Sequence, residues 1–290
     1  MIVAEHISDI RQFTYRARLD KARVGLVPTM GALHEGHLRL IGQMKQHAGR
    51  VVVSIFVNPT QFGPGEDFEA YPRQLQQDLD KCRDAGADAV FCPKREHIYA
   101  GKHFIRLELE HLGNRLCGAK RPGHFHGVIQ VVNKLFNIVG PDVAIFGQKD
   151  IQQYRILEQM TFEFNHAVEL VMGTTVRAAD GLALSSRNAY LSPEERALAP
   201  ALYGSLKKLR YELLSGMDSS NTSDKTAEQL LRETEKELNA SGFRTDYIEL
   251  VDYKELQPAT LPLESGCRYV LAAAAYLGKA RLIDNILLEA

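Results

Sequence analysis

The sequence contains no tryptophan and only four cysteines among its 290 residues. The cysteines, at positions 82, 92, 117 and 267, form no CxxC pair and match neither a disulfide framework nor the spacing of a zinc site. We therefore expect reduced and mostly buried thiols, which are typical of a cytoplasmic enzyme.

Long hydrophobic runs and an excess of charge of one sign are absent as well. No stretch approaches the roughly 20 apolar residues of a membrane-spanning helix. The first residues carry acids early and lack the basic start and apolar centre of a secretory signal, so we expect no membrane association and a cytoplasmic location. A formal net charge of −1 argues against a surface that binds nucleic acid.

Several signatures of common enzyme classes are missing. The sequence has no GxSxG, Walker A or GxGxxG motif, so hydrolase, P-loop and dinucleotide-binding functions lose support. Residues 34–37, HEGH, miss the zinc-protease pattern by one residue, because that pattern needs its histidines four apart. The remaining cations and hydrogen-bond donors suit chemistry in which the substrate supplies the nucleophile.

Apolar segments alternate with helical patterns through the first half of the chain. Buried strands are predicted at residues 24–27, 50–57, 89–92, 143–146 and 168–172, and helices at 7–19, about 34–47, 73–84, 128–139 and 151–164. This alternation predicts an α/β fold with a doubly wound parallel sheet. We also expect a strand at residues 104–109 and a loop at residues 117–127.

The second half has the pattern of a smaller α+β domain. A hairpin turns at residues 179–181, and a capping box at residues 192–195 predicts a helix to about residue 214. A polar linker at residues 215–224 and a helix at 225–239 precede strands near 247–251, 269–274 and 280–286. We predict two domains, residues 1–175 and 176–290.

The corner at residues 24–47 joins a strand to a helix and is our first candidate site. The first N–H groups of such a helix lack partners and its positive dipole end is exposed, which favours a bound phosphate. Gly31 and Gly36 allow close approach of an anion, and His34 and His37 lie on one side of the first helical turn. A corner whose histidines cap or pack locally remains an open alternative.

Residues 147–153 follow another strand and give the second candidate site. Asp150 and Gln153 have the spacing of a helix cap, which is a structural alternative. It leaves Lys149 unexplained, because a lysine just before a helix N-terminus repels the dipole unless an anion is bound there.

The third candidate site is the Leu184–Asn188 segment, LSSRN. The hydroxyls of Ser185 and Ser186 and the guanidinium of Arg187 can together donate several hydrogen bonds to a phosphate. The alternative is an exposed turn before a capped helix.

Weaker candidates lie outside these three segments. Gln61 is a polar candidate in the loop after the second strand, and Asp78 is either a metal-facing acid or a solvated acid on a helix. In the basic loop, Arg121 is the strongest candidate, whereas His124 and His126 are either ligands or solvated side chains.

Six ordered segments resemble the pantoate–β-alanine ligase family over essentially the whole chain: PTMGALHEGH, FVNPTQFGPGEDFEAYPR, RPGHFHGV, FGQKDIQQ, DGLALSSRNAYLS and ARLIDN. HEGH resembles the HIGH-type signature of Rossmann-like nucleotidyltransferases, and LSSR, which falls in the smaller C-terminal domain, resembles their KMSKS-like loop. The resemblance implies that pantoate's carboxylate attacks ATP to give pantoyl adenylate and pyrophosphate. The amine of β-alanine then releases pantothenate and AMP. The resemblance also implies Mg²⁺ and a homodimer.

The resemblance assigns residues to this reaction by position. The ATP site would comprise Met30, Gly31, Ala32, Leu33, His34, Glu35, Gly36, His37, Gly147, Gln148, Lys149, Asp150, Val176, Leu184, Ser185, Ser186 and Arg187. The catalytic residues among them would be His34, His37, Lys149, Ser185, Ser186 and Arg187. Pantoate would bind Gln61, Gln153, Met30 and Arg121, β-alanine would bind Gln61, and Asp78 would contact Mg²⁺ with the ATP.

These roles fit the charges involved, because a carboxylate that attacks a polyanion needs their mutual repulsion cancelled. His37 as proton donor stays a hypothesis, and we expect the loop at residues 63–69 to close and exclude water. The chain departs from the family's usual residues at Gln77, Gln130, Ile151 and Tyr154.

Two other functions remain open. Another nucleotidyltransferase of the superfamily would adenylylate a phosphorylated acceptor and would need further cations for it. A non-catalytic nucleotide-binding module would need the phosphate sites without the paired glutamines.

Overall fold

The computed structural model describes residues 1–66, 68–102, 104–215 and 225–289. The chain divides into two compact units. The first comprises Met1–Gly113, Arg121–Gln148 and Ile156–Thr174, and the second comprises Asn114–Lys120, Lys149–Arg155 and Thr175–Ala290. The functional division into domains 1–175 and 176–290 stays a prediction.

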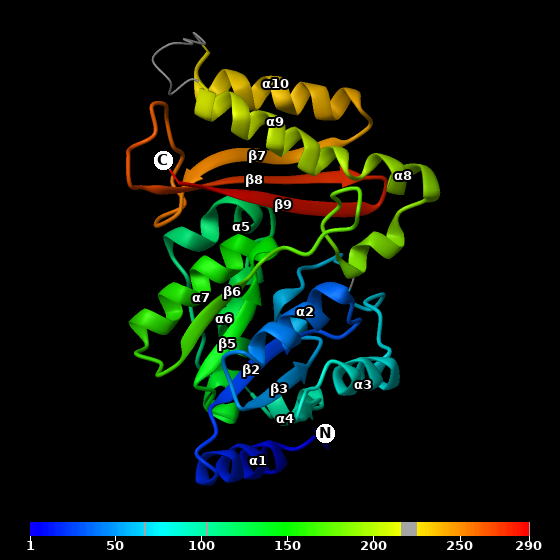
Figure 1. The fold of residues 1–290 in the computed structure, drawn as a ribbon, viewed down its shortest axis with the longest axis vertical. Coiled ribbons are helices and arrows are strands. Elements are labelled where there is room, and N and C mark those ends of the chain that lie inside the picture. Colours follow the sequence, from blue (N-terminus) through cyan, green and yellow to red (C-terminus); the bar gives the residue numbers. More distant parts are fainter. Residues whose placement is uncertain (67, 103, 216–224, 290) are drawn as a thin grey trace. The chain divides into compact units, whose positions relative to one another are not determined.

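The first unit contains a six-stranded parallel sheet with the order β1-β4-β3-β2-β5-β6, which confirms the predicted fold class. Its strands are β1 Ile2–Ala4, β2 Val24–Thr29, β3 Arg50–Ile55, β4 Ala89–Phe91, β5 Val143–Gly147 and β6 Glu169–Gly173 (Figure 1). Strand β3 is a buried and mostly β-branched run, and β2 is buried at five of its six positions, as expected of a parallel sheet that is covered on both faces.

Helices on the two faces bury this sheet. The first unit contains α1 Ile7–Leu19, α2 Glu35–Met44, α3 Leu75–Asp84, α4 Arg95–Ile98, α6 His124–Val139, most of α7 Ile151–Glu163 and the short η1 Pro59–Gln61 and η2 His111–Asn114. On one face, Ile41 and Met44 of α2 pack with Val27, Val53 and Ile145 of the strands. Helix α1 packs against α6 and against β2 and β4.

Two predictions, for residues 104–109 and 117–127, are wrong. Residues Phe104–Leu109 form no strand, and Phe104 and Ile105 are 90% and 82% exposed. Alternating β-formers make a strand only where a neighbouring strand and a packed face are available. The loop expected at residues 117–127 contains α5 Leu116–Lys120 and the start of α6. Its proline and glycine mark the N-terminus of α6, since Gly123 is the N-cap at φ +82°.

The second unit contains an antiparallel sheet, β7 Arg244–Asp252, β8 Arg268–Leu277 and β9 Ala280–Glu289, as predicted. Helices α9 Ala201–Ser215 and α10 Ala227–Ala240 lie along it (Figure 1) and bury a leucine-rich core. The unit also contains α5, α8 Pro193–Leu198, η4 Ser186–Tyr190 and part of η3 Gln148–Asp150.

Local signals in the second unit are mostly confirmed. Ser192 and Glu195 form the predicted capping box, at 3.2 and 2.8 Å. The single predicted helix is two helices, because Pro200 has no N–H with which to continue the hydrogen bonding of α8. The hairpin is present as one bridge between Arg177 and Ala183. The linker predicted at residues 215–224 lies outside the described residues, apart from residue 215 at the end of α9.

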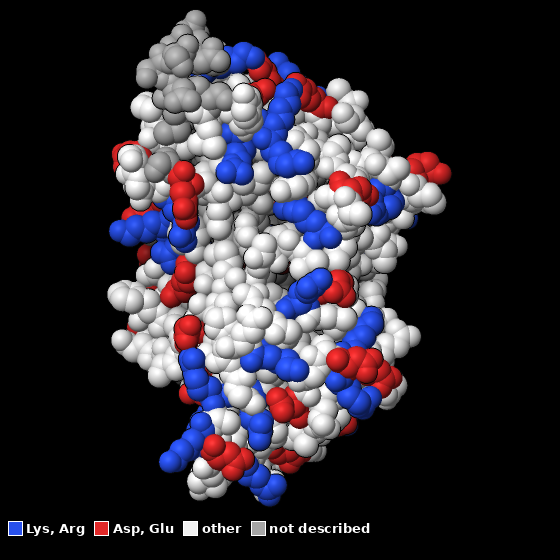
Figure 2. All heavy atoms as spheres, in the orientation of Figure 1, with Lys and Arg blue, Asp and Glu red and all other residues white. Residues whose placement is uncertain are grey.

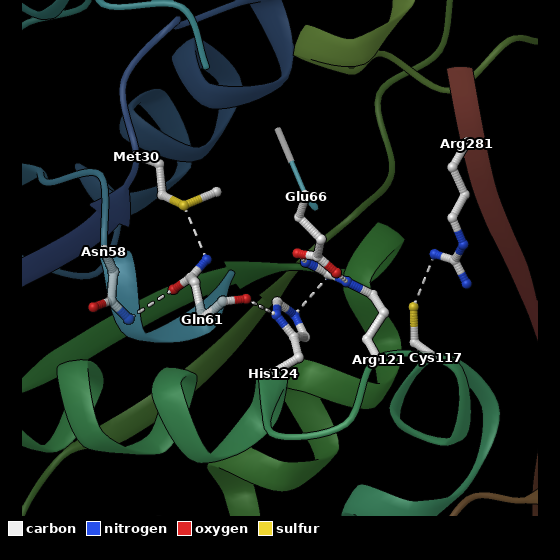
Figure 3. A network of polar contacts seen from close by, with 8 residues as sticks. All are labelled: Met30, Asn58, Gln61, Glu66, Cys117, Arg121, His124 and Arg281. Carbon is white, nitrogen blue, oxygen red and sulfur yellow. Dashed lines mark hydrogen bonds and ion pairs between the residues drawn. The ribbon is translucent and has the colours of Figure 1, made fainter. Parts of the chain in front are cut away.

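Polar contacts fix the Asn114–Lys120 segment within the second unit. Arg281 donates from Nη1 to the Cys117 sulfur at 3.1 Å and from Nη2 to Asp246 at 2.7 Å (Figure 3 shows the contact with Cys117). Arg115 donates to Gln257 at 2.5 Å. The segment is therefore part of this unit through side-chain contacts that a local sequence pattern does not encode.

Acidic and basic side chains are interspersed on the face that Figure 2 shows. This agrees with the near-neutral net charge of −1. Within the described residues, no helix is both long enough and apolar enough to span a membrane.

Candidate active site

The strand order reverses between β2 and β5, which are direct neighbours in the sheet. From β2 the chain continues through β3 to β4 on one side, and it later adds β5 and β6 on the other. In open α/β sheets, ligands bind outside the carboxyl ends of the strands at such a reversal. The residues that follow β2, β3 and β5 are therefore the first place to look for a site.

Asp78 fixes the backbone of the corner after β2. Its carboxylate oxygens accept hydrogen bonds from the N–H groups of Ala32 and Leu33, both at 2.8 Å. Gly31 and Ala32 have left-handed backbone angles, with φ of +82° and +50°, so the corner needs this support. Asp78 belongs to α3 and is only 1% exposed, so the alternative that it is a solvated acid is wrong.

The contacts of Asp78 also bear on the predicted Mg²⁺ site. Both of its oxygens already accept backbone N–H groups, which does not favour a direct metal bond. Within the described part of the chain, no group of three or more His, Cys, Asp or Glu side chains could hold a metal ion. The contact between Asp78 and Mg²⁺ stays a prediction.

His34 and His37 cap helix α2 reciprocally. The Nδ1 atom of His34 accepts from the N–H of Gly36 at 3.1 Å, and Nδ1 of His37 accepts from the N–H of His34 at 3.3 Å. The two ring centroids are 4.1 Å apart. A neutral imidazole that accepts at Nδ1 carries its proton on Nε2. The cap therefore makes Nε2–H a donor on both rings.

This cap corrects one expectation from the sequence. The N–H of Gly36 is bonded to the His34 ring, and the N–H of His37 donates to the His34 carbonyl at 2.8 Å. These two groups of the first helical turn are therefore paired, and the expectation that they are unpaired is wrong. Gly36 is required by the ring, because a Cβ there would lie 2.8 Å from Cε1 of His34.

Gln61 lies in η1, after β3, and is 8% exposed. Its amide nitrogen donates to the Met30 sulfur at 2.9 Å, and its amide oxygen accepts from Asn58 at 3.0 Å (Figure 3). Asn58 is 1% exposed and also accepts from the Tyr99 hydroxyl at 2.8 Å. These contacts set which end of the Gln61 amide donates.

Asn58 is a residue that the sequence analysis missed. The one available signal was its position between a buried strand and Pro59, where a polar side chain follows a strand end. Its amide nitrogen also donates to the carbonyl of Gly127 in α6 at 3.0 Å. A Cβ on Gly127 would overlap the Thr60 carbonyl oxygen, so α6 contacts η1 closely at this point.

A second chain of contacts reaches Gln61 from α6. His124 donates from Nδ1 to the Gln61 carbonyl at 2.7 Å, since a carbonyl can only accept. Its Nε2 then accepts from Nη1 of Arg121 at 3.0 Å. Arg121 pairs with Glu66 through Nε and Nη2, at 2.7 and 2.6 Å (Figure 3). These contacts favour a supporting role for Arg121, and its predicted contact with pantoate stays a prediction.

The pKa of Glu66 reflects this pairing. Burial raises the pKa of the carboxyl group, but the hydrogen bonds and positive charge of Arg121, helped by the N–H of Gly63, lower it further than burial raises it. The carboxylate is therefore stabilised in its charged form where it meets the guanidinium. Glu66 was also missed in the sequence, because its partner lies 55 positions away.

In the second unit, two predicted sites share one pocket. Lys149 and Ser185 both line it, together with Asn188, Tyr203, Arg281 and Asp284. The Lys149 side chain is 20% exposed, and its Nζ lies 3.9 Å from Asp150. Ser185 caps η4 by accepting from the N–H of Arg187 at 3.3 Å. The structure thus brings the lysine and the start of the LSSR segment together.

The remaining predicted residues are placed less specifically. Gln153 lies in the first turn of α7, and Val176 accepts from the N–H of Leu184 at 2.9 Å across the hairpin. Ile151 and Tyr154, which depart from the family's usual residues, are 4% and 5% exposed, so both contribute to packing.

The comparisons with known proteins agree with one another. The sequence model described as Pantoate-beta-alanine ligase matches residues 2–287. The pantothenate synthetase of Pseudomonas fluorescens (strain Pf-5) is 44% identical over 293 residues, which cover 100% of this chain and 98% of the relative. That of Alkalilimnicola ehrlichii is 47% identical, over 97% of this chain and 96% of the relative.

Solved structures give the same result. The crystal structure of pantothenate synthetase from Thermus thermophilus has a TM-score of 0.87 at 41% identity and covers 99% of both chains. A pantoate-beta-alanine ligase from Francisella tularensis, described as complexed with beta-gamma ATP and beta-alanine, has a TM-score of 0.78 at 35% identity, over 99% of this chain and 97% of that chain. The chain belongs to the pantoate–β-alanine ligase family.

Proposed function

We propose that this chain catalyses the ATP-dependent condensation of (R)-pantoate with β-alanine to pantothenate, with release of AMP and pyrophosphate. Family membership over residues 2–287 supports the reaction. The observation that carries the site assignment is the reciprocal cap of His34 and His37 at the strand-order reversal, which makes Nε2–H a donor on both rings.

In the first step, a carboxylate oxygen of pantoate attacks the α-phosphorus of ATP and pyrophosphate leaves. Both reactants are anions, so the barrier falls when donors and cations neutralise the phosphate oxygens. We assign this role to the Nε2–H groups of His34 and His37, to Lys149 and to the turn of Ser185, Ser186 and Arg187. The two imidazole N–H groups have fixed orientations and can donate to the phosphate oxygen whose negative charge grows during the attack. The lysine supplies a full positive charge.

Mg²⁺ enters this proposal as part of the substrate, MgATP. Magnesium sites in ATP-dependent enzymes commonly use the phosphates and one or two carboxylates, without an all-protein cage. Within the described residues no cluster of three or more His, Cys, Asp or Glu side chains could hold a metal ion, so the proposal assigns no protein ligand beyond the predicted contact of Asp78.

In the second step, the free amine of β-alanine attacks the acyl carbon of pantoyl adenylate and AMP leaves. The ammonium form has no lone pair, so β-alanine must lose a proton before attack. Gln61 and Gln153 are proposed to hold pantoate, because an amide donates to the carboxylate and accepts from the hydroxyls. For Gln61, its contacts with Asn58 and Met30 fix the amide in one orientation.

A cytoplasmic location and a homodimer are further proposals that rest on the family. Sedimentation of the purified chain at twice its own mass would support the dimer, and sedimentation at the mass of one chain would reject it.

The test is product identification. The purified chain is incubated with MgATP, pantoate and β-alanine, and the nucleotide and organic products are separated and identified. We expect AMP, pyrophosphate and pantothenate, with pantothenate formed only when both organic substrates are present. ADP as product, or turnover that ignores β-alanine, would reject the proposal.

A further inference from the structure

The ARLIDN segment of β9 carries two buried polar residues to which the proposed mechanism gives no role. Asp284 and Asn285 are 4% and 2% exposed, on a strand whose other buried residues are apolar. Burying polar side chains is unfavourable unless they are hydrogen-bonded. Their partners therefore indicate what the two residues do.

Asn285 holds the backbone of Lys149. Its amide nitrogen donates to the Lys149 carbonyl at 3.0 Å, and its own N–H donates to Asp284 at 2.8 Å. Lys149 lies in the short η3 between β5 and α7, where a regular helix or strand does not fix its backbone. The side chain that contacts the Lys149 carbonyl must be a hydrogen-bond donor, because a carboxylate at position 285 would place its oxygen against the carbonyl oxygen.

Asp284 holds the hairpin that leads to the LSSR turn. Its oxygens accept from Nη1 and Nη2 of Arg177, at 2.5 and 2.8 Å. Arg177 is the bridge partner of Ala183, two positions before Ser185. Its guanidinium carbon also lies 3.4 Å from the centroid of the Tyr203 ring. The start of the LSSR turn is therefore tied to β9 through a bidentate ion pair.

We propose that Asp284 and Asn285 are positioning residues for phosphate binding. These consecutive residues of β9 fix two parts of the site: Asn285 binds the carbonyl of Lys149, and Asp284 binds Arg177, which holds the start of the LSSR turn. Lys149, Ser185 and Asp284 line the same pocket. The inference rests on the proposed function, in which Lys149 and the serine turn neutralise ATP. Neither positioning residue is assigned a contact with substrate.

The test is a double-mutant cycle between Asn285→Ala and Lys149→Ala, measured as pyrophosphate release with MgATP and pantoate varied in turn. We expect Asn285→Ala to lower kcat/KM for ATP by about 10- to 100-fold, since a displacement of about 1 Å costs rate on this scale. With Lys149→Ala already present, Asn285→Ala should cost less than about twofold more, because its effect acts through that lysine. The KM for pantoate should change less than the KM for ATP.

Thr234→Val is the matched control. Thr234 is also buried in the second unit, at 5% exposure, and donates to a carbonyl at 2.9 Å within α10. It contacts neither Lys149 nor the hairpin residues in any described hydrogen bond, so its removal should shift thermal stability and leave kcat/KM near wild type. Asn285→Asp keeps the shape and removes the donor. Asn285→Asp is carried through the same cycle, so that the test still gives a result if Asn285→Ala is too unstable to measure.

The outcomes separate the two proposals. A wild-type chain that forms no AMP and no pantothenate rejects the proposed function. If the wild-type chain forms AMP and pantothenate, the proposed function stands and the variants test the positioning role alone. That role is overturned if the loss of kcat/KM in the Asn285 variants multiplies with the loss caused by Lys149→Ala. It is also overturned if the Asn285 variants lose no more kcat/KM than Thr234→Val does. Losses that vanish in the Lys149→Ala background establish it.

Discussion

Glu66→Gln tests whether the contact chain from α6 orients Gln61. The Arg121 and Glu66 side chains are 16% and 24% exposed, and the pair is bidentate at 2.7 and 2.6 Å. Exposed ion pairs contribute about 0–1 kcal/mol, and breaking a fully buried one costs about 3–5 kcal/mol. The glutamine keeps one acceptor, so we expect the free energy of unfolding to fall by about 1–2 kcal/mol.

The kinetic effect should fall on pantoate. The chain runs from Glu66 through Arg121 and His124 to the Gln61 carbonyl. Weakening it by about one hydrogen bond, about 1 kcal/mol, corresponds to about a fivefold rise in KM for pantoate, with little change in KM for ATP. Steady-state kinetics with each substrate varied in turn would measure both values.

The same pair predicts how stability depends on pH. The pKa of Glu66 in the folded chain lies below its ordinary value of 4.5. The contribution of Glu66 to the free energy of unfolding is therefore fully present above pH 4.5 and is lost as the pH falls through the folded pKa. Glu66→Gln should remove this part of the acid dependence in a urea titration at several pH values.

The control for Glu66→Gln is Asp80→Asn, which breaks the exposed pair of Asp80 with Arg83 in the same unit. It should leave both kinetics and thermal stability near wild type. If Glu66→Gln changes the KM for pantoate no more than Asp80→Asn does, the reasoning about Gln61 is refuted.

Three further sets of variants address the remaining contacts. Asp78→Asn loses one of two buried acceptors, so unfolding should become easier by about 1–3 kcal/mol in thermal melts. The Mg²⁺ concentration for half-maximal rate should not change, whereas a large shift would mean that Asp78 binds the metal. His37→Ala and Lys149→Ala should each lower kcat by about 10²–10³-fold with a smaller change in melting temperature, and near-normal turnover would contradict the charge role. Gly127→Ala places a Cβ against the Thr60 carbonyl, so η1 or α6 must shift; the KM for pantoate should rise, and an unchanged value would mean that this contact does not shape the site.

The elements that could be predicted from sequence are those that local burial specifies. The run at β3 is apolar and β-branched because both faces of that strand are covered, and the Ser192 capping box is complete within four residues. Residues 104–109 have a strand's alternation without a partner strand, so the same pattern gave a wrong prediction there. Local periodicity does not say whether another segment is available for pairing.

The candidate site was predictable only in part, for a related reason. The histidines, Lys149 and the LSSR segment stand next to strand ends or turns, which the sequence marks. The residues that hold the site in place are not marked in this way. Asp78 contacts the corner from 46 positions away, Glu66 contacts Arg121 from 55 positions away, and Asn285 contacts Lys149 from 136 positions away. A pair at such a separation is fixed by the packed sheet, and no spacing in a single sequence encodes it.

The structure bears on both interpretations of the histidine corner. The sequence alone opposed a local cap to a phosphate site built on the first N–H groups of α2. In the structure the His34 ring binds the N–H of Gly36, and the His34 carbonyl binds the N–H of His37, so neither backbone group is left for an anion. The same bonds commit each Nδ1 to accepting and each Nε2 to donating. The cap thus occupies these two backbone donors and holds both imidazoles in the tautomer whose Nε2–H is a donor. The proposed phosphate site therefore depends on the cap, because a ring released from it could present either nitrogen.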